Sequence, residues 1–225
     1  MKIEEEIFKR YCVCLDKLES FGFQKENDVY VYNKNFLDNQ FKAVITISND
    51  GKITGKVIET DLNEEYINLR INYENTFVNS VRNAYSEILV DIRNNCYIKK
   101  AFISNQSNRI AEYIYNKYSD SPEFLWAKFP GFGVFRNKKN NKWYGAIMNI
   151  DKSKIDKMNN HKEIEIINVK LSPDKVGELL MQKGFYKAYH MNNKSWITII
   201  LDDTIMDKVI EELIDESYSI IAGEK

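Results

Sequence analysis

Residues 132–150 read FGVFRNKKNNKWYGAIMNI, and this stretch decides the fold of the second half of the chain. Its two ends, 132–136 and 142–150, are rich in the aromatic and β-branched residues that favour strands. Between them lies Asn137-Lys138-Lys139-Asn140-Asn141, where asparagine tolerates the left-handed backbone that tight turns need. The pattern predicts an antiparallel β-hairpin.

A second stretch repeats this pattern further along the chain. Residues 189–191 and 195–201 flank Asn192-Asn193, which predicts another hairpin. The run Asn140-Asn141-Lys142-Trp143 of the first hairpin is echoed by Asn192-Asn193-Lys194-Ser195-Trp196 in the second. Each predicted turn therefore carries a lysine close to a tryptophan.

Helices are expected around the two hairpins. Ser104 is placed to cap one helix, because its hydroxyl can accept a hydrogen bond from a backbone N–H of the first turn. Ser172 followed by Pro173 predicts a second helix, which Gly184 would end. We also expect a short helix over 124–128, a strand over 163–169, and a final helix capped by Asp202 or Asp203.

The first half predicts a unit of the same class. Apolar residues recur at helical spacing from Ile3 to Leu18 and again from Phe77 to Ile92. Between these helices we expect an antiparallel meander with strands at 29–32, 41–47, 53–58 and 66–71. The fold class is therefore α+β: two consecutive α+β units with antiparallel sheets. We place the first unit, of unknown role, at residues 1–103 and the second at 104–225.

Composition is that of an ordinary globular protein, with 44% hydrophobic and 29% charged residues. The formal net charge of −1 excludes a protein that coats nucleic acid through overall charge, so any anion site must be local. The start of the chain lacks the apolar stretch of a signal peptide, and no apolar run approaches the roughly 20 residues that span a bilayer. We expect a cytoplasmic protein with reduced cysteines and no membrane partner.

Catalytic and metal-binding signatures are missing from the sequence. His161 and His190 are the two histidines, far apart and without a neighbouring ligand at metal-binding spacing. Cys12 and Cys14 fall on the first predicted helix, where their spacing directs them to different sides. The acidic run at Glu4 is interpreted as complementing the dipole of that helix. We therefore expect no catalytic residue, no metal and no cofactor.

Charge is segregated in the second half. Residues 124–150 and 179–201 contain no aspartate or glutamate, although acids slightly outnumber bases in the whole chain. If the hairpins lie side by side, their basic residues would form a positive face that binds the phosphates of nucleic acid, DNA being the expected partner. The candidate residues are Lys128, Arg136, Lys138, Lys139, Lys142, Lys187, His190 and Lys194.

Two other interpretations stand beside nucleic-acid binding. Lysines at hairpin tips also keep sheet edges soluble, in which case Trp143 and Trp196 belong to the core. Alternatively, the chain is an adaptor that binds another protein or a small ligand through the aromatic-rich segment 124–135.

The second half resembles the MmcQ/YjbR family of small bacterial proteins over roughly residues 104–222. The resemblance is carried by Glu123-Phe124-Leu125-Trp126, by Trp143-Tyr144-Gly145-Ala146, by residues 189–197 and by Glu216-Ser217-Tyr218. It implies a frataxin-like or double-wing fold in which the two hairpins are neighbouring wings packed against helices. It also implies DNA binding as a suggested activity, and it supplies no catalytic residue.

Overall fold

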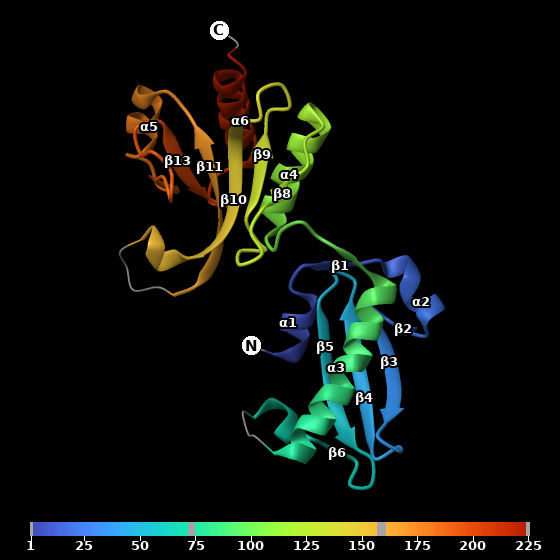
Figure 1. Cartoon of the computed structure of the whole chain (residues 1–225). Coiled ribbons are helices and arrows are strands. Elements are labelled where there is room, and N and C mark those ends of the chain that lie inside the picture. The colour runs from blue at the N-terminus through green and yellow to red at the C-terminus, as the bar shows by residue number, and fades with distance from the viewer. Residues whose placement is uncertain (1, 72–74, 157–160, 224–225) are drawn as a thin grey trace. The chain divides into compact units, whose positions relative to one another are not determined.

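The computed structural model describes residues 2–71, 75–156 and 161–223. The chain divides into two compact units, Met1–Lys100 and Ala101–Lys225. Each unit combines helices with an antiparallel sheet, as the sequence predicts (Figure 1).

The first unit is built around a five-stranded antiparallel sheet of order β2-β3-β4-β5-β6, crossed on one face by the long helix α3 (Figure 1). Strand β4 alternates buried and more exposed residues, so Ala43, Ile45 and Ile47 pack under α3. The elements are α1 (Ile3–Phe8), β1 (Tyr11–Val13), η1 (Leu15–Lys17), α2 (Leu18–Phe21), β2 (Gln24–Glu26), β3 (Val29–Phe36), β4 (Phe41–Ser48), β5 (Ile53–Glu59), β6 (Glu64–Glu65), η2 (Ile67–Arg70), α3 (Thr76–Cys96) and β7 (Tyr97–Lys99).

Two predicted elements of the first unit are wrong. The helix expected from Ile3 to Leu18 stops at Phe8, because the following β1 pairs with β7, the last strand of the unit in sequence. The strand expected over 66–71 is instead the 3₁₀ turn η2. There Leu69 is buried, while Ile67 and Ile71 are 64% and 49% exposed. The apolar residues at every second position therefore do not form one buried strand face.

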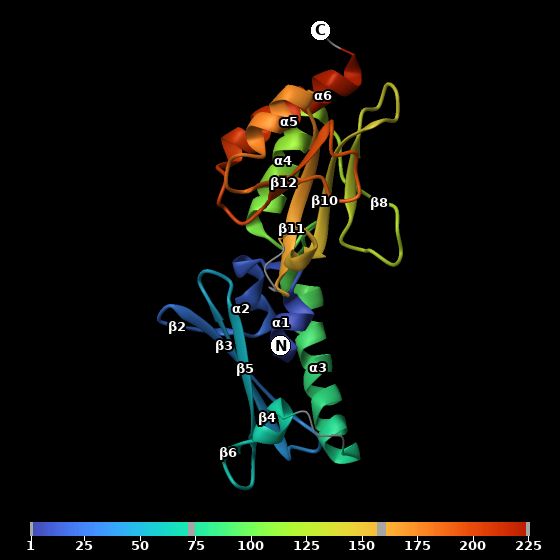
Figure 2. The same cartoon turned by 90° about the vertical axis from the view of Figure 1, so that its left-hand side faces the viewer.

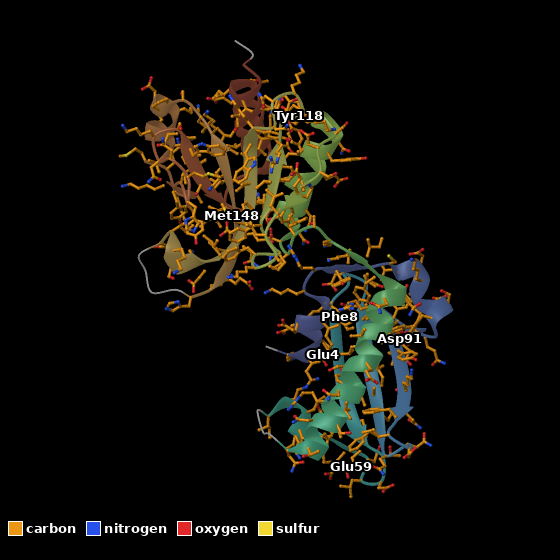
Figure 3. The ribbon with its side chains drawn as sticks, viewed as in Figure 1. Glu4, Phe8, Glu59, Asp91, Tyr118 and Met148 are labelled. Carbon is orange, nitrogen blue, oxygen red and sulfur yellow. The ribbon has the colours of Figure 1, made fainter. Side chains whose placement is uncertain are left out.

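An ion pair links Arg70 of η2 to the buried Glu4 of α1, which is labelled in Figure 3. Both carboxylate oxygens of Glu4 accept hydrogen bonds from Arg70 at 2.8 Å, and Tyr85 Oη donates a third at 2.6 Å. Burial alone would raise the pKa of Glu4, but these hydrogen bonds outweigh it and hold the pKa below its ordinary value. Glu4 therefore does more than complement the dipole of α1.

The second unit has a six-stranded antiparallel sheet of order β12-β13-β11-β10-β9-β8. Helices α4, α5 and α6 all lie against one face of this sheet (Figure 2). The elements are α4 (Asn105–Tyr118), β8 (Glu123–Phe124), β9 (Gly133–Arg136), β10 (Trp143–Asp151), η3 (Lys152–Lys154), β11 (Glu163–Lys170), α5 (Pro173–Leu179), β12 (Phe185–Lys187), β13 (Trp196–Ile200) and α6 (Asp207–Ala222).

Several local predictions for the second unit are confirmed. Ser104 caps α4 by accepting from Ser107 N–H, and Ser172 caps α5, with Pro173 in its first turn. The hairpin of β9 and β10 forms as the opening stretch predicts, and β11 lies where a strand was expected.

Four predictions for the second unit are wrong. Helix α5 ends at Leu179, well before the expected end at Gly184. Residues 124–128 form no helix, because Glu123 and Phe124 pair as a short strand with β9. The second hairpin uses 185–187 in place of 189–191 as its first strand. Helix α6 begins at Asp207, since Asp202 accepts from Thr204 N–H within a separate turn.

Candidate functional site: an aromatic pocket on the open sheet face

The sheet of the second unit buries apolar residues on both faces. One face forms the main core with α4, α5 and α6. The opposite face, called the open face below, carries a smaller cluster from the central strands, including Val134, Ala146, Met148 and Ile166. Its partners are loop residues such as Phe132, Tyr189 and Met191, which pack beside the strands. A face covered by loops can leave room for a ligand.

An aromatic pocket of about 310 Å³ lies on this open face. Its floor is made by Val134 of β9 and by Ala146 and Met148 of β10, with Met148 labelled in Figure 3. The walls come from three separate parts of the chain: the segment before β9, the start of β10, and the loop after β12. The wall residues are Trp126, Phe129, Phe132, Trp143, Tyr189, His190 and Met191.

The aromatic walls support one another through ring contacts. Trp126 meets Trp143 edge-to-face, with ring centroids 5.7 Å apart, and meets Phe132 edge-to-face at 6.4 Å. Phe129 stacks on Phe132 at 4.8 Å. Trp126 and Phe129 are nevertheless 37% and 51% exposed, so they present large apolar surfaces beside the pocket.

The opposite wall is fixed by a buried polar network, which we call the Asn168–Thr198 network. Asn168 of β11 and Thr198 of β13 are fully buried neighbours in the sheet. The Thr198 hydroxyl donates to Asn168 Oδ1 and accepts from Tyr189 N–H at 2.9 Å, while Asn168 Nδ2 donates to Tyr189 O at 2.7 Å. Both backbone polar groups of Tyr189 are thus satisfied from the sheet beneath.

His190 follows this anchor directly and lines the pocket. Its backbone φ of 58° lies in the left-handed region, which is uncommon for a residue with a side chain. The imidazole ring packs on Tyr189, with ring centroids 4.0 Å apart. An unusual backbone conformation held by a buried network is a frequent feature of binding sites.

The predicted basic hairpins share one sheet but are not direct neighbours. Strand β11 lies between them, pairing with β10 on one side and β13 on the other. The strand registers place Trp143 and Trp196 at the same end of the sheet, so the turn 137–142 and the loop 188–195 leave from that end. The expectation of adjacent wings is therefore wrong, although the common end is present.

The first turn is tied to the helical side of the sheet. Asn140 Nδ2 donates to Ile221 O in α6, and Lys138 Nζ donates to Ser119 O after α4. Lys138 also lies 3.4 Å from the buried carboxylate of Asp120, which accepts from Tyr144 Oη. Burial, with Asp120 beside it, raises the pKa of Tyr144. Meanwhile Tyr189 and Met191 of the second loop pack on the open face.

Two of the eight predicted phosphate-binding residues form ion pairs within the unit. Arg136 pairs with Glu123 at 3.0 Å and lies over the Trp143 ring, and Lys138 is held by Asp120. The other six are exposed: Lys128, Lys139, Lys142, Lys187, His190 and Lys194. The structure thus brings His190 into the aromatic pocket, whereas none of the described lysines lines it.

An acidic recess elsewhere in the second unit has a structural role. It is lined by Glu163, Glu165, Asp202 and Asp203 among others. The Glu165 carboxylate accepts from the backbone N–H groups of Ile103 and Ser104, which ties the start of α4 to the sheet. Within the described residues no group of three acids, histidines or cysteines is arranged to hold a metal ion. In the same residues, none of the helices combines the length and apolarity needed to cross a membrane.

Sequence reasoning found part of the pocket. The aromatic segment 124–135 was already an alternative binding surface, and His190 was a candidate for a different role. Ala146, Met148 and Met191 were not predicted as lining residues, because small or flexible apolar residues cannot be distinguished from core residues in a sequence. The positions of Trp143, Ala146 and Met148 along β10 were the one available indication of the pocket floor. They do not show which segments cover the open face of the sheet.

Comparisons with known proteins all concern about half of the chain. The family model described as YjbR matches residues 116–220. The uncharacterised protein YyaQ of Bacillus subtilis (strain 168) is 34% identical over 111 residues, which make up 49% of this chain and 93% of YyaQ. A crystal structure of a protein from Pseudomonas syringae is 37% identical, with a TM-score of 0.49, and covers 52% of this chain and 98% of that one. A protein from Deinococcus radiodurans is 19% identical, with a TM-score of 0.36, and covers 47% of this chain and 70% of its own.

Proposed function

We propose that this chain, which belongs to the YjbR family through its second unit, is a binding protein rather than an enzyme. In this proposal the aromatic pocket takes a flat ring system, either of a small molecule or of an aromatic group on a larger partner. The observation that carries the proposal is the pocket itself, with aromatic walls over an apolar floor. YyaQ is described as uncharacterised, so the proposal rests on this geometry.

The size and lining of the pocket suit a flat ring system. Ligand pockets usually measure roughly 300–1,000 Å³ and combine an apolar lining with few polar groups. At about 310 Å³, this pocket fits one or two fused rings. Edge-to-face pairs such as Trp126 with Trp143 leave ring faces and edges on which another ring can pack. A ligand would also cover the exposed part of Phe129, which favours binding through the hydrophobic effect.

The lining favours binding over chemistry. His190 is the sole lining residue, among the described ones, that commonly serves as an acid or base near neutral pH. A catalytic histidine usually works beside a nucleophile or a carboxylate that orients it. The other lining residues are apolar apart from Tyr189, so the pocket can hold and orient a ligand without an evident reaction.

Binding can be tested with naphthamide, a neutral bicyclic probe, titrated into the full chain and followed by calorimetry or ligand-observed NMR. The blocking variant is Ala146→Leu, because the buried alanine forms the floor and a longer side chain would project into the cavity. The matched control is Ala127→Leu, the same change at an exposed position outside the lining. Naphthamide should bind the wild type and the control and should lose affinity for Ala146→Leu.

Two results would contradict the pocket proposal. One is the absence of saturable binding by the wild type. The other is equal binding by the Ala146→Leu variant, provided that its thermal unfolding shows an intact second unit. Ala146→Val is a smaller filling change for the case in which leucine disturbs the fold.

Nucleic-acid binding stays as the second candidate because of one observation. The turn 137–142 and the loop 188–195 leave from the same end of the sheet, and both lie in segments without acids. Since Arg136 and Lys138 are engaged, five lysines are left to contact phosphates: Lys128, Lys139, Lys142, Lys187 and Lys194. Five phosphate contacts predict a slope of about −4.5 for log affinity against log salt with duplex DNA.

Fluorescence anisotropy with a labelled duplex measures that slope. Charge reversal of Lys139, Lys142 and Lys194 should weaken binding strongly if the hairpins contact phosphate. Charge reversal of Lys154 and Lys208, which are exposed elsewhere in the same unit, is the matched control. Binding without salt dependence, or an equal loss in both sets of variants, would exclude the hairpins as the contact surface.

A further inference from the structure

We infer that the ligand of the aromatic pocket is an anion: a flat aromatic ring system bearing a carboxylate or phosphate group. This inference rests on the proposed function, because it specifies the ligand class of the same pocket. It follows from the charges around the pocket rather than from its volume.

Negative charge is missing from the pocket and from the segments that build it. None of the ten described residues that line it is acidic. The segments 124–150 and 179–201, which supply all of these residues, contain no aspartate or glutamate. Glu123, the acid immediately before the first segment, is paired with Arg136. A positively charged ligand would therefore find no carboxylate within the walls.

Positive charge, in contrast, is present on the same segments. Lys128 is exposed and stands in the chain between the wall residues Trp126 and Phe129. Lys194 is exposed in the loop that begins with the wall residues Tyr189 to Met191. His190 lines the pocket itself, and its ring nitrogens can donate a hydrogen bond to an anionic oxygen.

Aromatic walls alone would favour the opposite charge. The faces of tryptophan and phenylalanine rings attract cations, and cages of such rings bind quaternary ammonium groups. Trp126 meets Trp143 and Phe132 edge-to-face, an arrangement that also leaves ring edges, the positive part of the ring, available to a ligand. Together with the flanking lysines and His190, this arrangement favours an anionic substituent on an aromatic ligand.

The test compares three ligands that share one ring system and differ in charge: naphthoate, naphthamide and naphthylmethylammonium. Dissociation constants are measured for the full chain at low and at high salt. We expect naphthoate to bind about tenfold more tightly than naphthamide at low salt, with the ammonium compound weakest, and the preference to shrink as salt screens the lysines. The variants Lys128→Gln and His190→Gln should each reduce the preference, whereas Lys208→Gln on α6 should leave it unchanged.

The possible results separate the inference from the proposed function. If none of the three compounds binds, the pocket proposal itself fails. If naphthamide binds at least as tightly as naphthoate, or the ammonium compound binds most tightly, the pocket proposal stands and the anionic ligand class is overturned. A preference for naphthoate that persists fully in both Lys128→Gln and His190→Gln would overturn the assignment of charge recognition to these residues.

Discussion

Replacement of Thr198 by valine tests the polar network under the pocket most directly. Valine has nearly the same shape as threonine but lacks the hydroxyl, which donates to Asn168 Oδ1 and accepts from Tyr189 N–H. The change would leave two polar groups without their partner. Because Asn168 and Thr198 are fully buried, water cannot replace the lost bond to Asn168 without opening the loop.

The size of the effect follows from these two groups. Leaving a buried donor or acceptor unsatisfied costs about 1–3 kcal/mol. The amide of Asn168 should contribute that full amount, and the partly exposed Tyr189 N–H should contribute near its lower end. We therefore expect Thr198→Val to lower the unfolding free energy of the second unit by about 2–4 kcal/mol. Thr198→Ser keeps the hydroxyl and loses one methyl group, so it should cost only about 1 kcal/mol.

Tryptophan fluorescence during urea unfolding measures this difference in the second unit alone. All three tryptophans of the chain, Trp126, Trp143 and Trp196, lie in that unit. Thr198→Val should also weaken the binding of naphthamide, because one wall of the pocket would no longer be held against the sheet. A valine variant as stable as the serine variant, with unchanged probe affinity, would show that the network does not anchor the wall.

Three further predictions concern other parts of the molecule. Gly55→Ala should destabilise the first unit by about 3 kcal/mol in circular-dichroism melts, since its Cβ would clash with the hydroxyl of the buried Tyr85; Gly177→Ala, where the Cβ meets open space, should not. Burial raises the pKa of Glu4, but hydrogen bonds from Arg70 and Tyr85 lower it by more, so the folded pKa lies below the unfolded one. The stability that ionised Glu4 gives the first unit is therefore complete above about pH 4.3, the unfolded pKa, and is lost as pH falls through the folded pKa. Urea unfolding at several pH values should show this acid-dependent loss in the wild type and not in a Glu4→Gln variant. Iodoacetamide at pH 8 should modify the exposed Cys12. Burial raises the pKa of Cys96 to about 11, so this thiol should stay unmodified until urea unfolds the chain. Mass spectrometry of the peptides measures the modification of each cysteine.

The parts of the fold that sequence predicted well are those set by neighbouring residues. A helix cap such as Ser104 depends on backbone groups within three positions, and the hairpin of β9 and β10 depends on one turn. Both are therefore visible in a short window of sequence. The long helix expected from Ile3 failed for the opposite reason, because β1 pairs with β7 across more than eighty residues of chain. No local periodicity reports such a partner.

The candidate site shows the same division. The aromatic character of residues 124–135 was visible in the sequence, whereas the shape they help to form was not. The pocket needs β10 as a floor and the loop 189–191 as an opposite wall, and that loop is placed by Asn168 and Thr198 from two other strands. Sequence reasoning assigned His190 to a charged hairpin tip, because nothing local predicts that the loop folds onto the open face.

Charge segregation was observed correctly in the sequence, but the structure changes which ligand it favours. A flat positive face for DNA would need both turns to present their cations together, yet Lys138 and Asn140 tie the first turn to the helical side. The second loop packs on the open face, beside the aromatic walls. The absence of acids therefore has its strongest consequence at the pocket. There a single anionic group on a ring would meet His190, and Lys128 and Lys194 belong to the segments that supply the walls. A small aromatic anion needs only this one site. For that reason it accounts for the absence of acids from both segments with fewer requirements than a long duplex does.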